Sequence, residues 1–318
     1  MARKLISYLI QSYGILAFLF CLLVAFSGQL TSHPSSEKNW NLSQSWFVSP
    51  SQALSLREKG AYLFDARASY DRIFRSLPNA KNISWEEFSA TSRPFKGKLL
   101  SKEVLEKKIL SLGVLKNDVI LVAGDPLAGW GEEGRIVWTL RSANFINSYI
   151  IDGGVTKFLE QSKQKKPVTT QVEISNINAE KSNQHSLDIE VETLRGSLQK
   201  SKDQISVLDV REEREFNGAT PYGETRGGHI PGAKWIYYKE FIDEDGFIKS
   251  KKEITALLSE KNISMKNMIV SYCTGGVRSA FTTSVLLSYG FQAQNYSGSM
   301  WEWASKDDQS YPLLKGKK

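Results

Sequence analysis

Residues 268–278 read Met-Ile-Val-Ser-Tyr-Cys-Thr-Gly-Gly-Val-Arg, and this stretch decides the fold. The apolar run 268–272 predicts a buried strand, and the two glycines predict a tight turn into a helix over 279–289. The cysteine, Cys273, therefore follows a buried strand directly. Open α/β sheets place their ligands at the C-terminal ends of their strands, so this loop is the first candidate for a functional site.

The rest of the second half alternates between strands and helices. We expect strands over 205–209 and 293–296 and a helix over 251–260. Continuous apolar strands separated by helices indicate a parallel sheet covered by helices on both faces. The second half is therefore predicted to be an α/β domain.

The first half repeats this order. Its expected elements are helix 51–59, strand 61–65, helix 102–111, strand 119–123, helix 134–143 and strand 148–152. The run Leu-Phe-Asp-Ala-Arg at 63–67 corresponds to Val-Leu-Asp-Val-Arg at 207–211. A period of this length indicates a duplicated domain and not a solenoid. The predicted fold class is α/β: two similar domains, each a parallel sheet flanked by helices, after an N-terminal hydrophobic helix.

Composition places the domain boundaries. Residues 31–45 are rich in Ser, Asn and Pro and are predicted to be a spacer. Residues 163–203 are rich in Lys, Gln, Ser and Asn and are predicted to be a linker, with a short helix near 189–201. The two domains then cover 46–162 and 204–318, which suits a chain of 318 residues.

Residues 1–30 are predicted to be a signal anchor or signal peptide. Arg3 and Lys4 precede an apolar stretch from about Leu5 to Phe26, which is long enough to span a bilayer. Positive charge before the stretch predicts a cytoplasmic N-terminus and an exported body. We expect an uncleaved membrane anchor, with secretion after cleavage near Ser27 as the alternative.

The charge and the cysteines exclude several classes of function. The net charge of +7 is spread along the chain without a basic stripe, so no nucleic-acid partner is expected. Of the two cysteines, Cys21 lies in the apolar segment, which leaves Cys273 alone in the rest of the chain. Neither a disulfide nor a metal cluster is therefore expected, and no cofactor either.

The loop around Cys273 has the features of a site for a reactive thiolate. Gly275 and Gly276 let successive backbone N–H groups point inward, as in an anion-binding nest. The N-terminus of the following helix adds partial positive charge. Both effects favour the thiolate, which is the nucleophilic form. We therefore expect Cys273 to be ionised and open to an incoming substrate.

Four segments in this half resemble the rhodanese family, in particular its tandem thiosulfate and mercaptopyruvate sulfurtransferases. They are VLDVREEREF at 207–216, GHIPGA at 228–233, CTGGVR at 273–278 and YSGSMWEW at 296–303. The duplication extends a weaker resemblance back to about residue 46. The resemblance implies a non-catalytic rhodanese-like domain over 46–162, whose equivalent loop 123–130 contains no nucleophile, and a catalytic one over 204–318.

The resemblance implies a sulfurtransferase with a two-step cycle. Cys273 would take the outer sulfur of a donor such as thiosulfate, hold it as a persulfide and pass it to cyanide or another thiophilic acceptor. The residues implied to bind the small-molecule substrate are Arg211, Thr274, Gly275, Gly276, Val277 and Arg278.

Several of these residues have structural alternatives. Arg211 could form an ion pair with Glu215, and Arg278 could pair with a nearby carboxylate. We expect Asp209 and Glu215 to support the loop, and His229 to cap or pack a turn.

Two residues of the first domain, Trp130 and Arg135, are expected to be a packed tryptophan and a surface arginine. A place in the cleft between the domains is their alternative.

The chain also departs from the family. Gly275 stands where the tandem thiosulfate enzymes have a basic residue, and the serine-containing loop of the mercaptopyruvate enzymes is absent. The loop instead resembles the C-x-G-G-x-R pattern of single-domain members. Met300 replaces the tryptophan usual in G-S-W-x-E-W. The identity of the donor therefore stays open.

Other functions fit parts of the same pattern. A membrane-anchored, non-enzymatic sulfur-sensing or scaffold protein could use the same fold. Cysteine phosphatases carry H-C-x-x-x-x-x-R, whereas here Tyr272 precedes the cysteine and Arg278 comes one residue too early. A disulfide oxidoreductase is disfavoured because there is no C-x-x-C motif.

Overall fold

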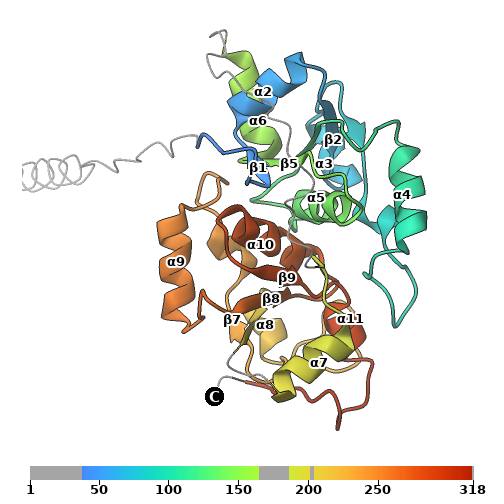
Figure 1. Ribbon diagram of the computed structural model, residues 1–318, viewed down its shortest axis with the longest axis vertical. Helices are drawn as coiled ribbons and strands as arrows, with labels where there is room; N and C mark the ends of the chain where they lie inside the picture. Colours follow the sequence, from blue (N-terminus) through green and yellow to red (C-terminus); the bar gives the residue numbers. More distant parts are fainter. Residues whose placement is uncertain (1–37, 165–185, 201–203, 317–318) are drawn as a thin grey trace, which may run out of the picture. The chain divides into compact units, whose positions relative to one another are not determined.

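The computed structural model describes residues 38–164, 186–200 and 204–316 (Figure 1). The predicted N-terminal hydrophobic helix and the middle of the predicted linker lie outside the described residues. Within these ranges no helix combines the length and the apolar character that crossing a membrane requires.

The first half contains a parallel five-stranded sheet with the order β1-β5-β4-β2-β3. The strands are β1 (Phe47–Val48), β2 (Tyr62–Asp65), β3 (Lys81–Asn82), β4 (Ile120–Ala123) and β5 (Ser148–Ile151). The helices are α2 (Pro50–Glu58), α3 (Ser69–Phe74), α4 (Lys102–Leu110), α5 (Glu132–Ser142) and α6 (Gly154–Lys163), with a 3-10 turn η1 (Trp85–Phe88).

The second half contains a parallel four-stranded sheet with the order β7-β6-β8-β9. The strands are β6 (Ile205–Asp209), β7 (Lys234–Trp235), β8 (Met268–Tyr272) and β9 (Ala293–Asn295). The helices are α7 (Val191–Lys200), α8 (Glu213–Phe216), α9 (Lys251–Glu260), α10 (Val277–Ser288) and α11 (Ser299–Trp303), with a 3-10 turn η3 (Tyr238–Phe241).

The two sheets have the same strand order. The order β5-β4-β2-β3 in the first corresponds to β9-β8-β6-β7 in the second. The predicted α/β fold with parallel sheets flanked by helices is thus confirmed in both halves. Both belong to one compact unit, residues 37–318.

The segment 186–200 differs from its prediction as part of a linker. A parallel bridge joins Asp188 to Asn295, in the place that β1 takes beside β5 in the first sheet. Leu194 of α7 is fully buried in a core cluster with Val207 and Val270. The short helix expected near 189–201 is confirmed as α7. The polar composition concealed that one face of this helix packs into the core of the second half.

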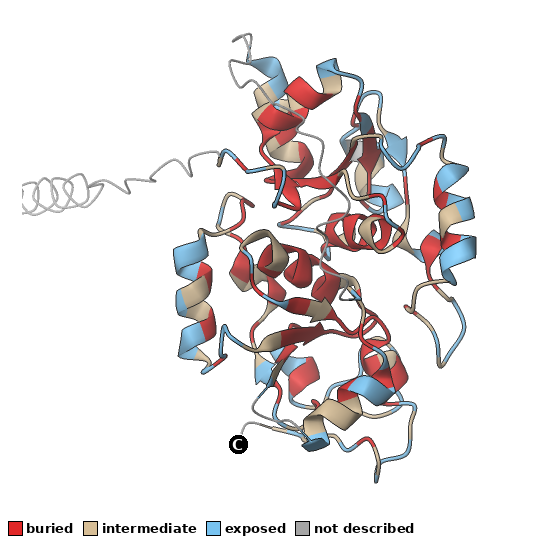
Figure 2. Ribbon diagram, in the orientation of Figure 1, coloured by how far each residue is buried: buried red, intermediate tan, exposed pale blue. Residues whose placement is uncertain are grey.

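Helices α5 and α10 bring the two halves together. Both are buried along most of their length (Figure 2). Gly134 permits this contact, because a Cβ at that position would lie 2.5 Å from Cα of Phe281. The cysteine loop immediately precedes α10, so this packing also positions the loop against the first half.

Replacing Gly134 by alanine is expected to destabilise the protein. Overpacking against a backbone atom costs about 1–3 kcal/mol, more than the better helix propensity of alanine returns. Urea unfolding measures the change. Gly196→Ala is the matched control, because Gly196 is also helical but a Cβ added there would meet no atom within 4 Å; it should stabilise by about 0.5–1 kcal/mol. Equal stability of the two variants would contradict the close packing.

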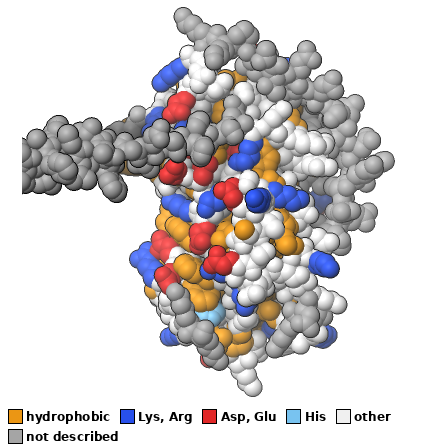
Figure 3. Space-filling model, turned by 90° about the vertical axis from the view of Figure 1, so that its left-hand side faces the viewer, with side chains coloured by type: hydrophobic (Ala, Val, Ile, Leu, Met, Phe, Trp, Pro, Cys, Tyr) orange, Lys and Arg blue, Asp and Glu red, His pale blue; other side chains and the backbone are white. Residues whose placement is uncertain are grey.

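The surface carries charges of both signs. On the face shown in Figure 3, Lys and Arg side chains are interspersed with Asp and Glu side chains. This distribution matches the spread of the net charge of +7 along the sequence.

Candidate active site

The cysteine loop connects β8 to α10. Gly276 is the N-cap of α10 and has a φ of 80°, a left-handed conformation that glycine adopts without strain. In this conformation its N–H donates to Sγ of Cys273 over 3.1 Å. The Ser279 hydroxyl lies 3.6 Å from the same sulfur. Two donors therefore converge on the sulfur atom, as expected for a site that stabilises a thiolate.

The loop carbonyls are bound by other groups. The N–H of Met300 donates to the Cys273 carbonyl over 3.2 Å, and the N–H of Trp301 donates to the Thr274 carbonyl over 2.9 Å. The Cys273 N–H donates in turn to Oγ of Ser299 over 3.0 Å. The segment that begins α11 thus fixes the loop's carbonyls away from the sulfur.

A buried ion pair links the end of the cysteine loop to α8. Arg278 forms two hydrogen bonds to Glu215, of 2.7 and 2.9 Å. The Thr274 hydroxyl also donates to Glu215, over 2.7 Å. Of the two alternatives for Arg278, the structure therefore contains the pair with a carboxylate. All three side chains are almost fully buried, so the pair constrains the two ends of the loop.

The environment lowers the pKa of the Cys273 thiol. Burial on its own raises this pKa, but the charge of Arg278, donors from Ser279 and the Gly275 N–H together outweigh it. A thiol with a lowered pKa contains more of the nucleophilic form at neutral pH than free cysteine does.

The thiol is nevertheless less accessible than the sequence predicts. Cys273 is only 1% exposed. The indole of Trp301 lies against Gly275, and the backbone of Gly97 approaches the Gly275 carbonyl. The expectation of an open thiol is therefore wrong for this conformation, because these two residues cover the loop.

The surroundings of Gly275 leave no space for the basic residue that the tandem thiosulfate enzymes have at this position. A Cβ at this position would lie 2.1 Å from the Trp301 ring. The ring itself is held by a hydrogen bond from Nε1 to the Tyr222 carbonyl and carries Lys96 over its face, 4.2 Å from the centroid. A long basic side chain at position 275 would displace this tryptophan. Val277, two residues after Gly275, is half-buried and begins α10.

Arg211 is held by a neighbouring carboxylate. It is fully buried and forms a bidentate pair with Asp209, with distances of 2.9 and 2.6 Å, and not the pair with Glu215 that was its structural alternative. Arg67 and Asp65 form the same pair in the first half, with distances of 3.0 and 2.7 Å. Because that half has no cysteine, this geometry indicates a structural element common to both sheets.

His229 packs a turn. Its ring stacks on Phe216 with the centroids 3.7 Å apart, and Nδ1 lies 3.0 Å from the Phe216 carbonyl. Its backbone pairs with Leu314. These contacts place it in the packing role considered for it.

The first half contributes residues to the site. Trp130 is 38% exposed; its ring lies 5.0 Å from the Arg278 guanidinium and meets Tyr222 edge to face. Arg135 is 0% exposed, so the expectation of a surface arginine is wrong. It donates to the Gly276 carbonyl over 3.0 Å. The sequence does not reveal the roles of Tyr222 and Trp301, since neither a loop nor a helix of five residues gives a periodic signal.

The position equivalent to the cysteine in the first half is Gly124. Ala123 pairs with Asp65 as Tyr272 pairs with Asp209, so Gly124 and Cys273 follow their strands identically. A Cβ at Gly124 would lie 2.0 Å from Oε2 of Glu133. The volume of a side chain at the cysteine position is thus filled by a buried carboxyl group.

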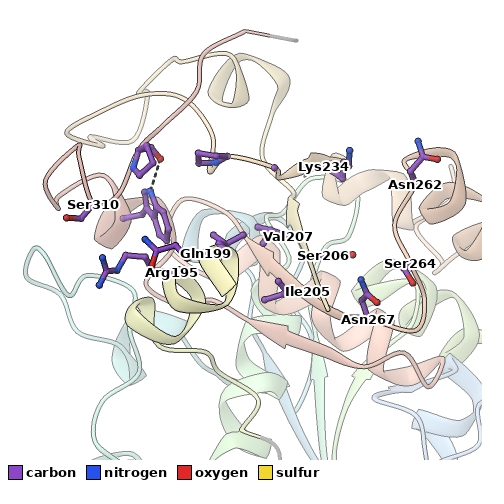
Figure 4. A pocket seen from close by; sticks show the side chains of 15 residues that line it. Arg195, Gln199, Ile205, Ser206, Val207, Lys234, Asn262, Ser264, Asn267 and Ser310 are labelled. Atoms are coloured by element: carbon purple, nitrogen blue, oxygen red, sulfur yellow. Dashed lines mark hydrogen bonds between the residues drawn. The ribbon is translucent and has the colours of Figure 1, made fainter. Parts of the chain in front are cut away.

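A separate cavity of about 820 Å³ lies in the second half (Figure 4). Ile205, Ser206 and Val207 of β6 line it, together with Asn267, which precedes β8. Cys273 follows β8, so the cavity and the cysteine lie at opposite edges of the sheet. Among the described residues no cluster of His, Cys, Asp and Glu is suited to a metal ion.

Comparison with known proteins shows what the chain is similar to. Residues 190–306 match the rhodanese-like domain. The sulfur carrier protein TtuD of Thermus thermophilus is 27% identical over 264 residues, which cover 76% of this chain and 85% of that protein. The 3-mercaptopyruvate sulfurtransferase of Mus musculus is 25% identical over 278 residues, which cover 84% and 90%.

Solved structures share the fold. YnjE is similar with a TM-score of 0.68 at 20% identity, over 86% of this chain and 69% of that one. An EanB variant in complex with ergothioneine has a TM-score of 0.70 at 16% identity, over 87% and 72%. Residues 190–306 are therefore similar to the rhodanese-like domain, in a chain that resembles sulfurtransferases over most of its length.

Proposed function

We propose that the protein is a sulfurtransferase that carries a sulfane sulfur as a persulfide on Cys273. The observation that carries this proposal is the 3.1 Å contact of the Gly276 N–H with Sγ, in a loop whose carbonyls are bound elsewhere. The resemblance to proteins named as sulfurtransferases supports it.

With thiosulfate as donor, the chemistry is balanced without a cofactor. The thiolate attacks the outer sulfur, the S–S bond of the donor breaks and sulfite leaves with the electron pair. A thiophilic acceptor such as cyanide then attacks the terminal sulfur of the persulfide, which forms thiocyanate and returns the thiolate. The loop N–H groups stabilise the negative charge on sulfur in both steps.

The buried thiol places a condition on this cycle. A donor reaches Cys273 only when the contacts of Gly97 and Trp301 with the loop open. These contacts involve one loop of the first half and one aromatic side chain, and loop movements of this kind are common in enzymes.

Intact-mass analysis of the full chain tests the proposal. Treatment with thiosulfate is expected to add one sulfur atom, roughly 32 Da, which cyanide removes. Cys273→Ser should gain no sulfur and should transfer none to cyanide. The backbone bonds of the loop are kept in this variant, so loss of the gain cannot be assigned to misfolding if its thermal unfolding is unchanged. If the wild-type protein takes up no sulfur from thiosulfate, mercaptopyruvate or a persulfide donor, the proposal is wrong.

A non-enzymatic sulfur-sensing or scaffold role is the second candidate. The burial of Cys273 favours it, because a sensor needs slow modification and no turnover. A persulfide that forms once but is not turned over with excess donor and cyanide would select this role.

We also propose that residues 5–26 anchor the chain in a membrane with the body exported, with secretion after cleavage near Ser27 as the alternative. The proposal rests on the hydropathy and charge of the sequence. Carbonate extraction of membranes followed by N-terminal sequencing distinguishes an uncleaved anchor from a cleaved, secreted chain. Extraction of an uncleaved chain would contradict both.

A further inference from the structure

Arg135 reaches the cysteine loop from the half that has no cysteine. It lies on α5, and its Nη1 donates to the Gly276 carbonyl over 3.0 Å. Its Nη2 donates to Oγ of Ser89 over 2.9 Å and to the Gly97 carbonyl. The guanidinium therefore binds both the N-cap residue of α10 and the segment that covers the loop.

The charge of Arg135 is not neutralised by an ion pair. The side chain is fully buried, its Nε has no hydrogen-bond partner, and it takes part in none of the ion pairs among the described residues. Burial lowers its pKa to about 10. The negative groups that oppose this effect are Asp188, the Cys273 thiolate and Glu86.

Asp188 does not act as the counter-ion of Arg135. Asp188 is bound by the N–H and the hydroxyl of Ser297, over 2.9 and 2.6 Å, and burial raises its pKa to about 6. Backbone carbonyls and an aromatic ring stabilise the Arg135 cation, with the Trp138 centroid 4.9 Å from its guanidinium. One of these carbonyls belongs to Gly276, whose N–H contacts the sulfur, so the guanidinium is tied to the cysteine loop. The Cys273 thiolate is one of the negative charges that act on it.

We infer that Arg135 is a positioning residue of the Cys273 site, which holds Gly276 by its carbonyl so that the N–H of the same residue faces the sulfur, and which provides positive charge for the thiolate. This inference deepens the proposed function and rests on it for its biological meaning. It assigns the first half a part in sulfur chemistry, because this half supplies both the anchor of Gly276 and a cation near the cysteine.

Arg141 provides a matched control. It lies on the same helix, it donates to the backbone carbonyls of Ser148 and Ser45, and burial likewise lowers its pKa to about 10. Its cation stacks on Trp46 and Tyr149, away from the cysteine loop. Arg141→Met therefore removes a half-buried arginine from the same helix without touching residues 273–278.

The test is the pH dependence of alkylation of Cys273 by iodoacetamide in the full chain, followed by peptide mass spectrometry so that Cys21 does not contribute. The midpoint reports the thiol's ionisation and does not depend on sulfur transfer. Arg135→Met should raise the midpoint by about 0.5 to 1 pH unit, which corresponds to roughly three- to tenfold less thiolate at neutral pH. The midpoint of Arg135→Lys should lie between those of the wild type and Arg135→Met. Lysine keeps the charge, but it lacks the planar guanidinium that bridges Gly276 and Gly97.

Arg141→Met should leave the midpoint at the wild-type value. Wild-type midpoints in both Arg135 variants would overturn the inference, and so would an equal shift in Arg141→Met. If Arg135→Met does not fold, the alkylation midpoint of Arg135→Lys is compared with that of Arg141→Met. A raised midpoint in Arg135→Lys alone supports the inference, and equal midpoints overturn it. A shifted midpoint in a protein that takes up no sulfur would refute the proposed function and leave the positioning role of Arg135 intact.

Discussion

Glu215→Gln is expected to lower the free energy of unfolding by about 3–5 kcal/mol, because it leaves the Arg278 guanidinium buried without a counter-ion. Glu215 is fully buried and accepts two bonds from Arg278 and one from Thr274. Burial raises the pKa of Glu215, but the bonds from Arg278 outweigh that effect and lower it. Urea unfolding at pH 7, where the carboxylate is ionised, measures the loss.

The reciprocal variant separates stability from chemistry. Arg278→Met is expected to cost a similar amount, because it leaves Glu215 as a buried, unpaired carboxylate. Burial raises the pKa of the Cys273 thiol, and Arg278 is the strongest of the groups that lower it. The alkylation midpoint should therefore rise in Arg278→Met, whereas in Glu215→Gln the uncompensated arginine should keep it at or below the wild-type value. If the alkylation midpoint shifts by the same amount in both variants, the shift is caused by loosening of the loop and not by the charge of Arg278.

Two comparisons check the interpretation as an ion pair. The double variant, Glu215→Gln with Arg278→Met, should recover much of the lost stability, because neither charge is then buried alone. Removal of Glu106 from its partly exposed pair with Lys116 should cost at most about 1 kcal/mol. Additive losses in the double variant would contradict a strong coupling of the two residues.

The regular elements of the fold could be predicted because their signals are local. Strands 205–209 and 268–272 and helix 251–260 have the predicted bounds. The helix expected over 279–289 begins two residues earlier, at Val277, because Gly276 can act as a left-handed N-cap. The composition of segment 186–200 favours a linker because its apolar face is narrow and its partner, Asn295, lies far along the chain.

The site could be predicted only in part, for a similar reason. The position of Cys273 follows from the strand and the glycines next to it. The burial of Arg135 depends on a contact with Gly276, 141 residues away, which no periodicity reveals. The resemblance implies a substrate-binding role for Arg211, with an ion pair as its alternative, and the pair of Arg67 with Asp65 shows that the observed arrangement also exists in a half without a nucleophile.

Glu133→Gln is expected to stabilise the protein at alkaline pH and to change little at pH 5. Glu133 is fully buried, and its Oε2 has no hydrogen-bond partner among the described residues. Burial, with a smaller contribution from the charge of Glu132, raises its pKa from 4.5 to about 8. The carboxyl group occupies the space at Gly124, and in the part of the chain that the structure describes Glu133 takes part in no ion pair that would neutralise a carboxylate.

The sign of the pH dependence follows from this difference in pKa. Between about pH 4.5 and 8 the folded protein keeps a proton that the unfolded chain releases, so the stability provided by this group is complete below the lower value and is lost as the pH rises towards the upper one. Glutamine has no proton to lose. The stability of Glu133→Gln relative to the wild type should therefore grow by up to about 1.4 kcal/mol per pH unit over this interval and reach about 2–4 kcal/mol at pH 9.

Urea unfolding of both proteins at several pH values between 5 and 9 measures this difference. Glu58→Gln, at the exposed end of α2, is the control and should follow the wild-type curve, because solvent reaches its side chain in both states. A constant difference between Glu133→Gln and the wild type at every pH would mean that Glu133 is already ionised in the folded protein. The cysteine-equivalent position of the first half would then contain a buried anion, and some rearrangement around Gly124 would have to stabilise it.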